Sequence, residues 1–334
     1  MRKPDFNNIL KVLQLKAPDR PTLFEFFLNP RLYAHLAECH EGDLTYPYLK
    51  CDPVVRAFAA AGYDYATVHG SRFHFPSSVK DTIKTKSLNA GAVITDIESF
   101  NEYNWPNPDD FDYSHMKNYE MPDGMKLMVA GPNGILENVI ELCGYENLCI
   151  MTYEEPQLVY DIFENVGKRL LQYYELSIKH KSVGLLMSND DWGFNTQTML
   201  SPDDMRKFVF PWHKKIVELA HNTGIPAVLH SCGNLEKIMD DIIDVMKYDG
   251  KHSYEDNILC VEDSYRKWGS RISILGGIDL NFIVTKKPEE ITKRCRSMLE
   301  LGKTGYALGT GNSVPEYVPW ENYFAMTKAA LEND

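Results

Sequence analysis

The stretch GLLMSNDDWGFNTQTMLSPDDMRKFVFPWHKKIVELAHNTGIPAVLHSCGN (184–234) contains two apolar runs separated by one helical pattern. The runs at 184–189 and 226–230 are almost continuously apolar, as expected of strands that are buried on both faces of a parallel sheet. The residues 201–224 between them begin with Ser201, which suits an N-cap, and end with a glycine that suits a C-cap. This stretch therefore predicts a strand, a helix and a second strand in succession.

The same alternation continues along the whole chain and predicts its fold. Further strand-like runs are LFEFF (23–27), YATVH (65–69), KLMVAG (126–131), GKHS (250–253), ISILGGI (272–278) and YALGTG (306–311), and further helical patterns lie at 155–180, 234–248 and 288–305. Eight strands alternating with helices predict an α/β fold, a single (β/α)8 TIM barrel over residues 1–334. An open doubly wound sheet is the alternative, but no Gly-x-Gly-x-x-Gly follows the first strand. We expect the irregular region of about 70–125, rich in Pro, Asn, Asp and aromatic residues, to form an excursion over one end of the barrel.

Composition narrows the class of protein. The chain has 334 residues and a net charge of −12, with 44% hydrophobic and 25% charged residues. These values are typical of a soluble globular protein, and the negative charge disfavours nucleic acid and anionic membrane surfaces as partners. No apolar run approaches the length of a membrane span, and the N-terminal residues lack the pattern of a signal peptide. Seven scattered cysteines do not form a disulfide framework, so we expect a cytoplasmic, reduced protein.

Polar side chains follow the predicted strands at their C-terminal ends, where barrels of this type hold their chemistry. In chain order they are Glu25, His69, Arg72, His74, Asn189, Asp190, Asp191, His230, Cys232, Lys251, His252, Glu255, Asp256, Asp279, Thr310 and Asn312. Each of them alone has an ordinary structural explanation, because an aspartate can cap a helix and a free cysteine or a histidine can fill a core. Their recurrence at successive strand ends indicates a site.

Three segments carry a resemblance to a known family. The residues 188–234, together with GGIDLNFIV (276–284) and YALGTGNSVPEYVPWENYFAM (306–326), resemble the uroporphyrinogen decarboxylase superfamily. The resemblance implies a single (β/α)8 barrel. It also implies one of two activities, because the superfamily includes the decarboxylase of the heme pathway and a branch of zinc methyltransferases that serve corrinoid proteins. The related decarboxylases tend to dimerise, so a homodimer is the assembly that the resemblance implies.

The decarboxylase branch would require arginines after the first strand to bind the substrate's carboxylates in bidentate fashion. Here the segment RPTLFEFFLNPRLYAHL (20–36) carries Glu25 and apolar residues at that place, with Arg31 as a weak substitute. A polyanionic substrate would also meet a ring of acidic side chains at the strand ends. The sequence therefore departs from the decarboxylase pattern.

The methyltransferase branch has His-x-Cys at the fifth strand and a further cysteine at the eighth. His230 and Cys232 match the first element, whereas Thr310 stands near the place of the second cysteine. A third zinc ligand would then come from Glu255, His252 or Asp279, because zinc accepts carboxylate oxygen as well as nitrogen and sulfur. The resemblance thus implies a zinc-dependent methyltransferase component, and its corrinoid would be carried by a separate partner protein.

Roles for the remaining residues follow from their places at the strand ends. We expect Asp190, Asp191 and Asp279 to be catalytic and Glu25, His69, Arg72, Trp192 and Asn312 to bind substrate, while the aromatic residues Phe73, Phe75, Tyr103, Trp105 and Trp192 either line the pocket or pack the barrel. The leading hypothesis is methyl transfer from a methylated small molecule, such as a methyl ether. The alternatives are a metal-free decarboxylase-like lyase, in which Asp190 or Asp191 polarises a pyrrole-like substrate, and a non-catalytic binding protein.

Overall fold

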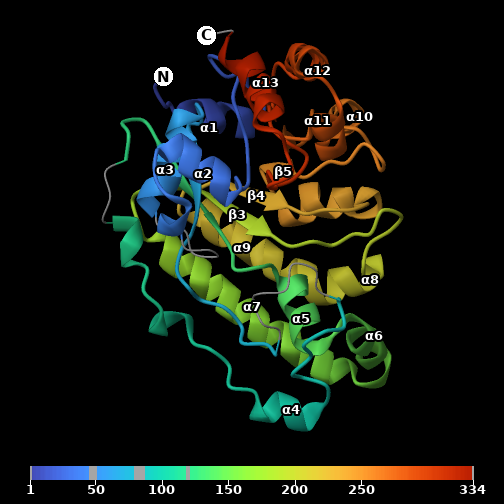
Figure 1. Ribbon diagram of the computed structural model, residues 1–334. Helices are drawn as coiled ribbons and strands as arrows, with labels where there is room; N and C mark the ends of the chain where they lie inside the picture. The colour runs from blue at the N-terminus through green and yellow to red at the C-terminus, as the bar shows by residue number, and fades with distance from the viewer. Residues whose placement is uncertain (1, 45–50, 79–86, 118–120, 333–334) are drawn as a thin grey trace.

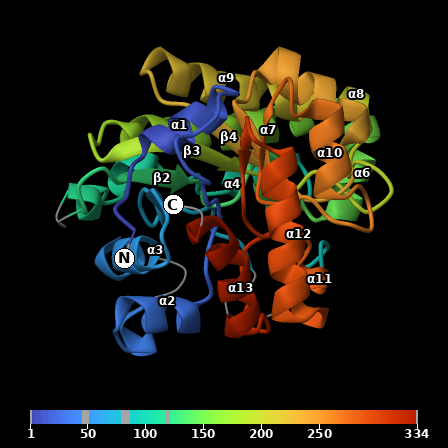
Figure 2. The same ribbon diagram turned by 90° about the horizontal axis from the view of Figure 1, so that it is seen from above.

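The computed structural model describes residues 2–44, 51–78, 87–117 and 121–332, and these form an α/β fold around one parallel sheet. The sheet has seven strands in the order β1 to β7: β1 (Tyr65–His69), β2 (Lys126–Ala130), β3 (Val183–Asn189), β4 (Ala227–His230), β5 (Gly250–His252), β6 (Ser273–Leu275) and β7 (Tyr306–Ala307). Each strand pairs with the next one along the chain, as strand–helix repeats require. Helices surround these strands when the molecule is seen from above (Figure 2).

The helices fill the connections between the strands (Figure 1). They are α1 (Asn7–Leu13), α2 (Pro30–Ala37), α3 (Cys51–Ala60), α4 (Ile97–Glu102), α5 (Ile135–Cys143), α6 (Tyr145–Glu154), α7 (Pro156–Ile178), α8 (Pro202–Asp204), α9 (Phe210–Asn222), α10 (Val261–Trp268), α11 (Leu280–Thr285), α12 (Pro288–Leu301) and α13 (Trp320–Leu331). Short turns are η1 (Glu41–Asp43), η2 (Pro108–Asp110), η3 (Ser114–Lys117) and η5 (Glu236–Ile238), and η4 (Met205–Val209) and η6 (Asp241–Met246) are π-helical. Among the described residues, every helix is too short or too polar to cross a lipid bilayer.

Seven of the eight expected strands are confirmed, and the eighth, at 23–27, is reduced to one parallel bridge. Leu23 pairs with Leu308, and the Phe24 amide donates to the Leu308 carbonyl at 2.8 Å. On the other side, the Tyr65 hydroxyl bonds to both the amide and the carbonyl of Glu25, each at 2.7 Å. Because a side chain takes the backbone groups that a strand ladder would use, the segment does not pair with β1. The described residues therefore form a seven-stranded parallel sheet, where a closed barrel of eight strands was expected.

The helix predicted at 201–224 is present but interrupted. Ser201 is its N-cap, accepting the Asp204 amide at 3.1 Å, and the chain then continues through α8, the π-helical η4 and α9. Pro211 lies at the start of α9 and has no amide hydrogen, so a widened turn before it is expected. The patterns at 155–180 and 288–305 form α7 and α12, whereas the pattern at 234–248 forms only η5 and η6.

Between β1 and β2, the described part of the irregular region passes along α7 (Figure 1). The Arg169 guanidinium on α7 donates to the Pro106 carbonyl at 2.9 Å and lies 4.9 Å from the centre of the Trp105 ring. Neighbouring aromatic rings of this region also pack on one another: Phe73 on Phe75, Phe75 on Trp105, and Tyr103 on Trp105. These contacts favour the packing interpretation of this group over a pocket wall.

Candidate metal centre

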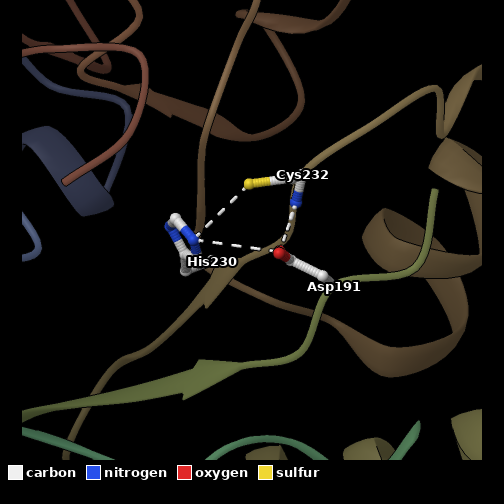
Figure 3. A group of neighbouring side chains, drawn as sticks. All are labelled: Asp191, His230 and Cys232. Carbon is white, nitrogen blue, oxygen red and sulfur yellow. Dashed lines mark hydrogen bonds and ion pairs between the residues drawn. The ribbon is translucent and has the colours of Figure 1, made fainter. Parts of the chain in front are cut away.

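The C-terminal ends of β3, β4 and β5 lie side by side and bring three potential ligands together. The register pairs Asn189 with His230 and His230 with His252. Just beyond these pairs, the ligand atoms of Asp191, His230 and Cys232 all lie within 4.8 Å of one another. His230 Nε2 is 3.7 Å from Cys232 Sγ and 3.9 Å from Asp191 Oδ1 (Figure 3). One nitrogen, one sulfur and one oxygen therefore converge on a single point.

Two loops must approach closely to form this group, and glycines permit the approach. The loop after β3 carries Asp191, the loop after β4 carries Cys232, and the Cys232 amide donates to Asp191 Oδ1 at 2.8 Å. Gly233 has φ +87°, and a Cβ there would lie 2.1 Å from the Gly193 carbonyl oxygen. A side chain at this crossing would therefore separate the two loops and the ligands that they carry.

The donor set fits zinc. A tetrahedral zinc ion with bonds of about 2.0–2.3 Å holds its ligand atoms about 3.3–3.8 Å apart. The separations of 3.7 and 3.9 Å from His230 Nε2 to the Cys232 and Asp191 atoms are near this range. Histidine, cysteine and carboxylate are all zinc ligands, and three protein ligands leave a fourth position for an exogenous group.

The Cys232 sulfur is surrounded by hydrogen-bond donors. The Ser253 hydroxyl donates to it at 3.3 Å and the Asn312 Nδ2 at 3.2 Å. The amide of Asn312 has a fixed orientation, because its Oδ1 accepts the Ser313 amide at 2.7 Å. Burial, reinforced by the Asp191 carboxylate, nevertheless raises the pKa of the Cys232 thiol well above its ordinary value. A thiolate here requires a compensating positive charge, which a metal ion would supply.

His230 is held from behind by a second histidine. The Nδ1 atoms of His230 and His252 are 2.8 Å apart, and His252 Nε2 lies 3.2 Å from the Thr310 carbonyl oxygen. Burial, together with the nearby Lys251 ammonium, lowers the pKa of His230 to about 3, and burial also lowers the pKa of His252 well below its ordinary value. Both nitrogens of His252 are thus engaged, Nδ1 by the rear nitrogen of His230 and Nε2 by the Thr310 carbonyl oxygen. The structure favours a supporting place for His252 over the ligand role expected from the sequence.

Two of the aspartates expected to be catalytic accept backbone amides at the starts of helices. Asp190 is fully buried, and its carboxylate accepts the backbone amides of Leu136 and Glu137 at the start of α5, each at 2.9 Å, and contacts His213 Nε2 at 2.9 Å. Asp279 caps α11 through the Phe282 amide at 2.9 Å. These oxygens are engaged in holding helices, and a catalytic role for either residue stays a prediction.

The residues expected to bind substrate divide into three groups. Asn312 reaches the candidate site through the Cys232 sulfur. Glu25 and Trp192 are fully buried: Glu25 accepts from the Thr310 amide and hydroxyl at 2.7 Å each, and Trp192 packs on other rings. Both side chains are engaged within the protein interior, and their contact with substrate stays a prediction. Of the other residues expected to bind substrate, Arg72 is exposed and His69 stacks on Phe27. Glu255 was expected to be a metal ligand. It accepts the Gly233 amide at 3.4 Å and lies outside the three-residue group.

The sequence analysis placed Asp191 at the site as a catalytic residue, and the structure brings it together with His230 and Cys232 as a possible third ligand. Two neighbouring residues, Ser253 and Glu137, were not singled out from the sequence. Ser253 follows β5 within the KHSYED segment, so its position at a strand end was a usable signal. Glu137 lies in the first turn of α5, where no strand-end pattern marks it, and burial together with Asp191 and Asp190 raises the pKa of its carboxyl well above the ordinary value.

Comparison with known proteins identifies the family. The model of the uroporphyrinogen decarboxylase (URO-D) family matches residues 128–332. The chain belongs to this family. Among curated URO-D relatives, a methylated-thiol–coenzyme M methyltransferase of Methanosarcina mazei is 24% identical over 57% of this chain and 49% of its own length. A uroporphyrinogen decarboxylase of Prochlorococcus marinus is 25% identical over 53% of this chain and likewise 49% of its own length.

The match to these URO-D relatives thus spans about half of their length. A solved structure, a methyltransferase from Methanosarcina mazei, superposes with a TM-score of 0.67 at 15% identity and covers 97% of both chains. At that identity the likeness establishes a shared fold over nearly the whole chain. The chain is therefore a member of an enzyme family and has a URO-D-like fold.

Proposed function

We propose that this protein is a zinc-dependent methyltransferase component of a corrinoid system. It would move a methyl group between a methylated small molecule, such as a methyl thioether or methyl ether, and a corrinoid carried by a separate protein. The observation that carries the proposal is the convergence of Asp191, His230 and Cys232 at the strand ends. We also propose that the fold is a (β/α)8 barrel in which the segment 23–27 completes the ring of strands between β7 and β1.

The three residues of the group would hold the zinc through Nε2, Sγ and a carboxylate oxygen. When bound, zinc acts as a Lewis acid on the sulfur or oxygen atom that carries or receives the methyl group. The protein itself supplies orientation: Ser253 and Asn312 direct their hydrogens at the Cys232 sulfur. Metal ligands in proteins commonly depend on such neighbours for their direction and basicity.

An aromatic row beside the group suits a substrate with an apolar part. The Phe26 ring lies 4.6 Å from the His230 ring, the Phe27 ring lies 4.3 Å from Phe26, and His69 stacks on Phe27 at 5.2 Å. An apolar substituent placed along this row would lose water contact on binding, which favours association. In this proposal His69, at the end of the row, would lie near the substrate.

The metal-free lyase alternative is weaker. It requires Asp190 or Asp191 to polarise a pyrrole-like substrate, but Asp190 is fully buried and its oxygens are occupied by α5 and His213. The segment after the first strand also has Glu25 in place of carboxylate-binding arginines. The observed hydrogen bonds therefore leave Asp191 alone for that chemistry.

Metal analysis tests the proposal. Freshly purified wild-type protein, dialysed in metal-free buffer, is expected to hold about one zinc per chain, and His230→Ala and Cys232→Ser are expected to lose it. Cys260→Ser is the matched control, because Cys260 lies beside Asp263 and outside the group. Methyl transfer is then tested with reduced free cobalamin as the methyl acceptor and with methyl thioethers or aryl methyl ethers as methyl donors. The formation of methylcobalamin is measured. Wild-type protein that neither retains zinc nor rebinds it would contradict the proposal.

A further inference from the structure

A chain of hydrogen bonds runs behind the candidate zinc ligands. It begins at the Thr310 carbonyl oxygen, passes through both ring nitrogens of His252 and ends at His230 Nδ1, with separations of 3.2 Å and 2.8 Å. Thr310 and His252 have no exposed surface. Water therefore does not compete for these bonds, and each donor and acceptor has to be satisfied within the chain itself.

The positions of the protons in this chain follow from the acceptor at its far end. A carbonyl oxygen only accepts, so His252 Nε2 must carry a hydrogen toward Thr310. Both rings are buried near the buried Lys251 ammonium, which disfavours a positive charge on either. A neutral His252 then has a bare Nδ1, and the hydrogen between the two rings belongs to His230 Nδ1. His230 Nε2 is left without a hydrogen, and its lone pair faces Cys232 and Asp191.

Thr310 is itself fixed by groups that the reaction does not use. Its amide and hydroxyl both contact the Glu25 carboxyl at 2.7 Å, and the same hydroxyl makes a short contact with the Asn312 carbonyl oxygen. Asn312 in turn donates to the Cys232 sulfur. Thr310 thus connects to His230 through His252 and to Cys232 through Asn312, although it contributes no atom to the metal group.

We propose that Thr310 and His252 form a positioning relay that holds His230 in the tautomer whose Nε2 lone pair points at the metal position. His252 and Thr310 are positioning residues in this inference, since neither contacts the metal position or the substrate. The consequence for metal binding rests on the proposed function, whereas the ring tautomers can be tested without any metal. Loss of such an outer partner typically weakens metal binding by about 10–100-fold.

Two variants of nearly equal size separate the relay from simple loss of a ring. His252→Asn keeps an oxygen acceptor for His230 Nδ1, whereas His252→Leu has a similar shape and no acceptor. Zinc affinity, measured by competition with a chromophoric chelator, is expected to fall about 10–100-fold in His252→Leu and to stay nearer wild type in His252→Asn. The same Asn and Leu pair at His180, which is buried at the other end of β3, is expected to leave zinc affinity unchanged.

The metal-free protein gives the second readout. Nitrogen NMR of histidine-labelled wild-type protein is expected to show His230 protonated on Nδ1 and His252 protonated on Nε2, with the assignment made from His230→Ala and His252→Asn. A His230 ring protonated on Nε2, or equal zinc affinity in His252→Leu and His252→Asn, would overturn the relay. If wild-type protein binds no zinc but shows these tautomers, the proposed function fails and the relay stands.

Discussion

Replacing Glu25 by glutamine is expected to change how the stability of the protein depends on pH. Burial raises the pKa of this carboxyl from 4.5 to about 8, against the opposing hydrogen bonds from Thr310. The hydrogen-bond pattern agrees, because the single hydroxyl hydrogen of Thr310 lies between Glu25 Oε2 and the Asn312 carbonyl oxygen. If that hydrogen points to Asn312, a hydrogen on Glu25 is needed to complete the other contact. The raised pKa and this shared hydrogen both favour the protonated form of Glu25 in the folded protein at neutral pH.

The sign and size of the effect follow from proton linkage. Between pH 4.5 and about 8 the folded protein keeps the Glu25 proton while the unfolded chain has released it, so stability falls as pH rises. The slope is about 1.4 kcal/mol per pH unit, which gives a ceiling of about 4–5 kcal/mol over the window and no further loss above it. Glu25→Gln cannot ionise, so its stability relative to wild type is expected to rise across this window and then become constant.

Urea unfolding followed by circular dichroism at pH 5.5, 6.5, 7.5 and 8.5 measures this difference. Tyr65→Phe is the matched control: it removes the hydroxyl that bonds to the backbone of Glu25, and its cost is expected to be the same at all four pH values. A difference between Glu25→Gln and wild type that does not change with pH would refute a protonated Glu25.

Three further substitutions have distinct expected outcomes. Asp190→Asn is expected to lower the free energy of unfolding by about 3 kcal/mol, because a buried side chain with three hydrogen-bond partners loses an acceptor oxygen, while bound zinc stays stoichiometric. Lost zinc with unchanged stability would contradict this role. Asp191→Asn is expected to keep the fold and lose zinc affinity in chelator competition, and unchanged affinity would remove Asp191 from the site. Gly233→Ala is expected to lose zinc, because its Cβ would meet the Gly193 backbone. Gly224→Ala is the control and is expected to keep zinc, because Gly224 has a similar positive φ but no atoms near the position of a Cβ. Equal zinc contents in the two variants would contradict this explanation.

The sequence predicted the sheet well where apolar runs are continuous. Six of the seven strands overlap such runs, because residues buried on both faces leave an apolar signal, whereas β5 (Gly250–His252) contains a lysine and a histidine. The run at 23–27 has the same signal but forms only a bridge at Leu23. The difference is made by the Tyr65 hydroxyl, a side chain from a distant part of the chain that occupies the backbone groups of Glu25. Local composition contains no information about such a contact.

The site was predicted in its location but not in its roles. The strand-end rule selected Asp191, His230 and Cys232, which converge in the structure. It could not distinguish Asp191 from its neighbour Asp190, because their different partners, Cys232 for Asp191 and the start of α5 for Asp190, come from distant parts of the chain. The third ligand was expected from later strand ends, because the close crossing at Gly233 cannot be inferred from sequence spacing.

A zinc-edge anomalous difference map from crystals of the protein tests the central claim most directly. The account predicts one peak bonded to His230 Nε2, Cys232 Sγ and an Asp191 oxygen at about 2.0–2.3 Å, with the fourth position free or occupied by a small molecule. Crystals grown with zinc that show no peak between these three residues, or a peak bonded to other side chains, would contradict it.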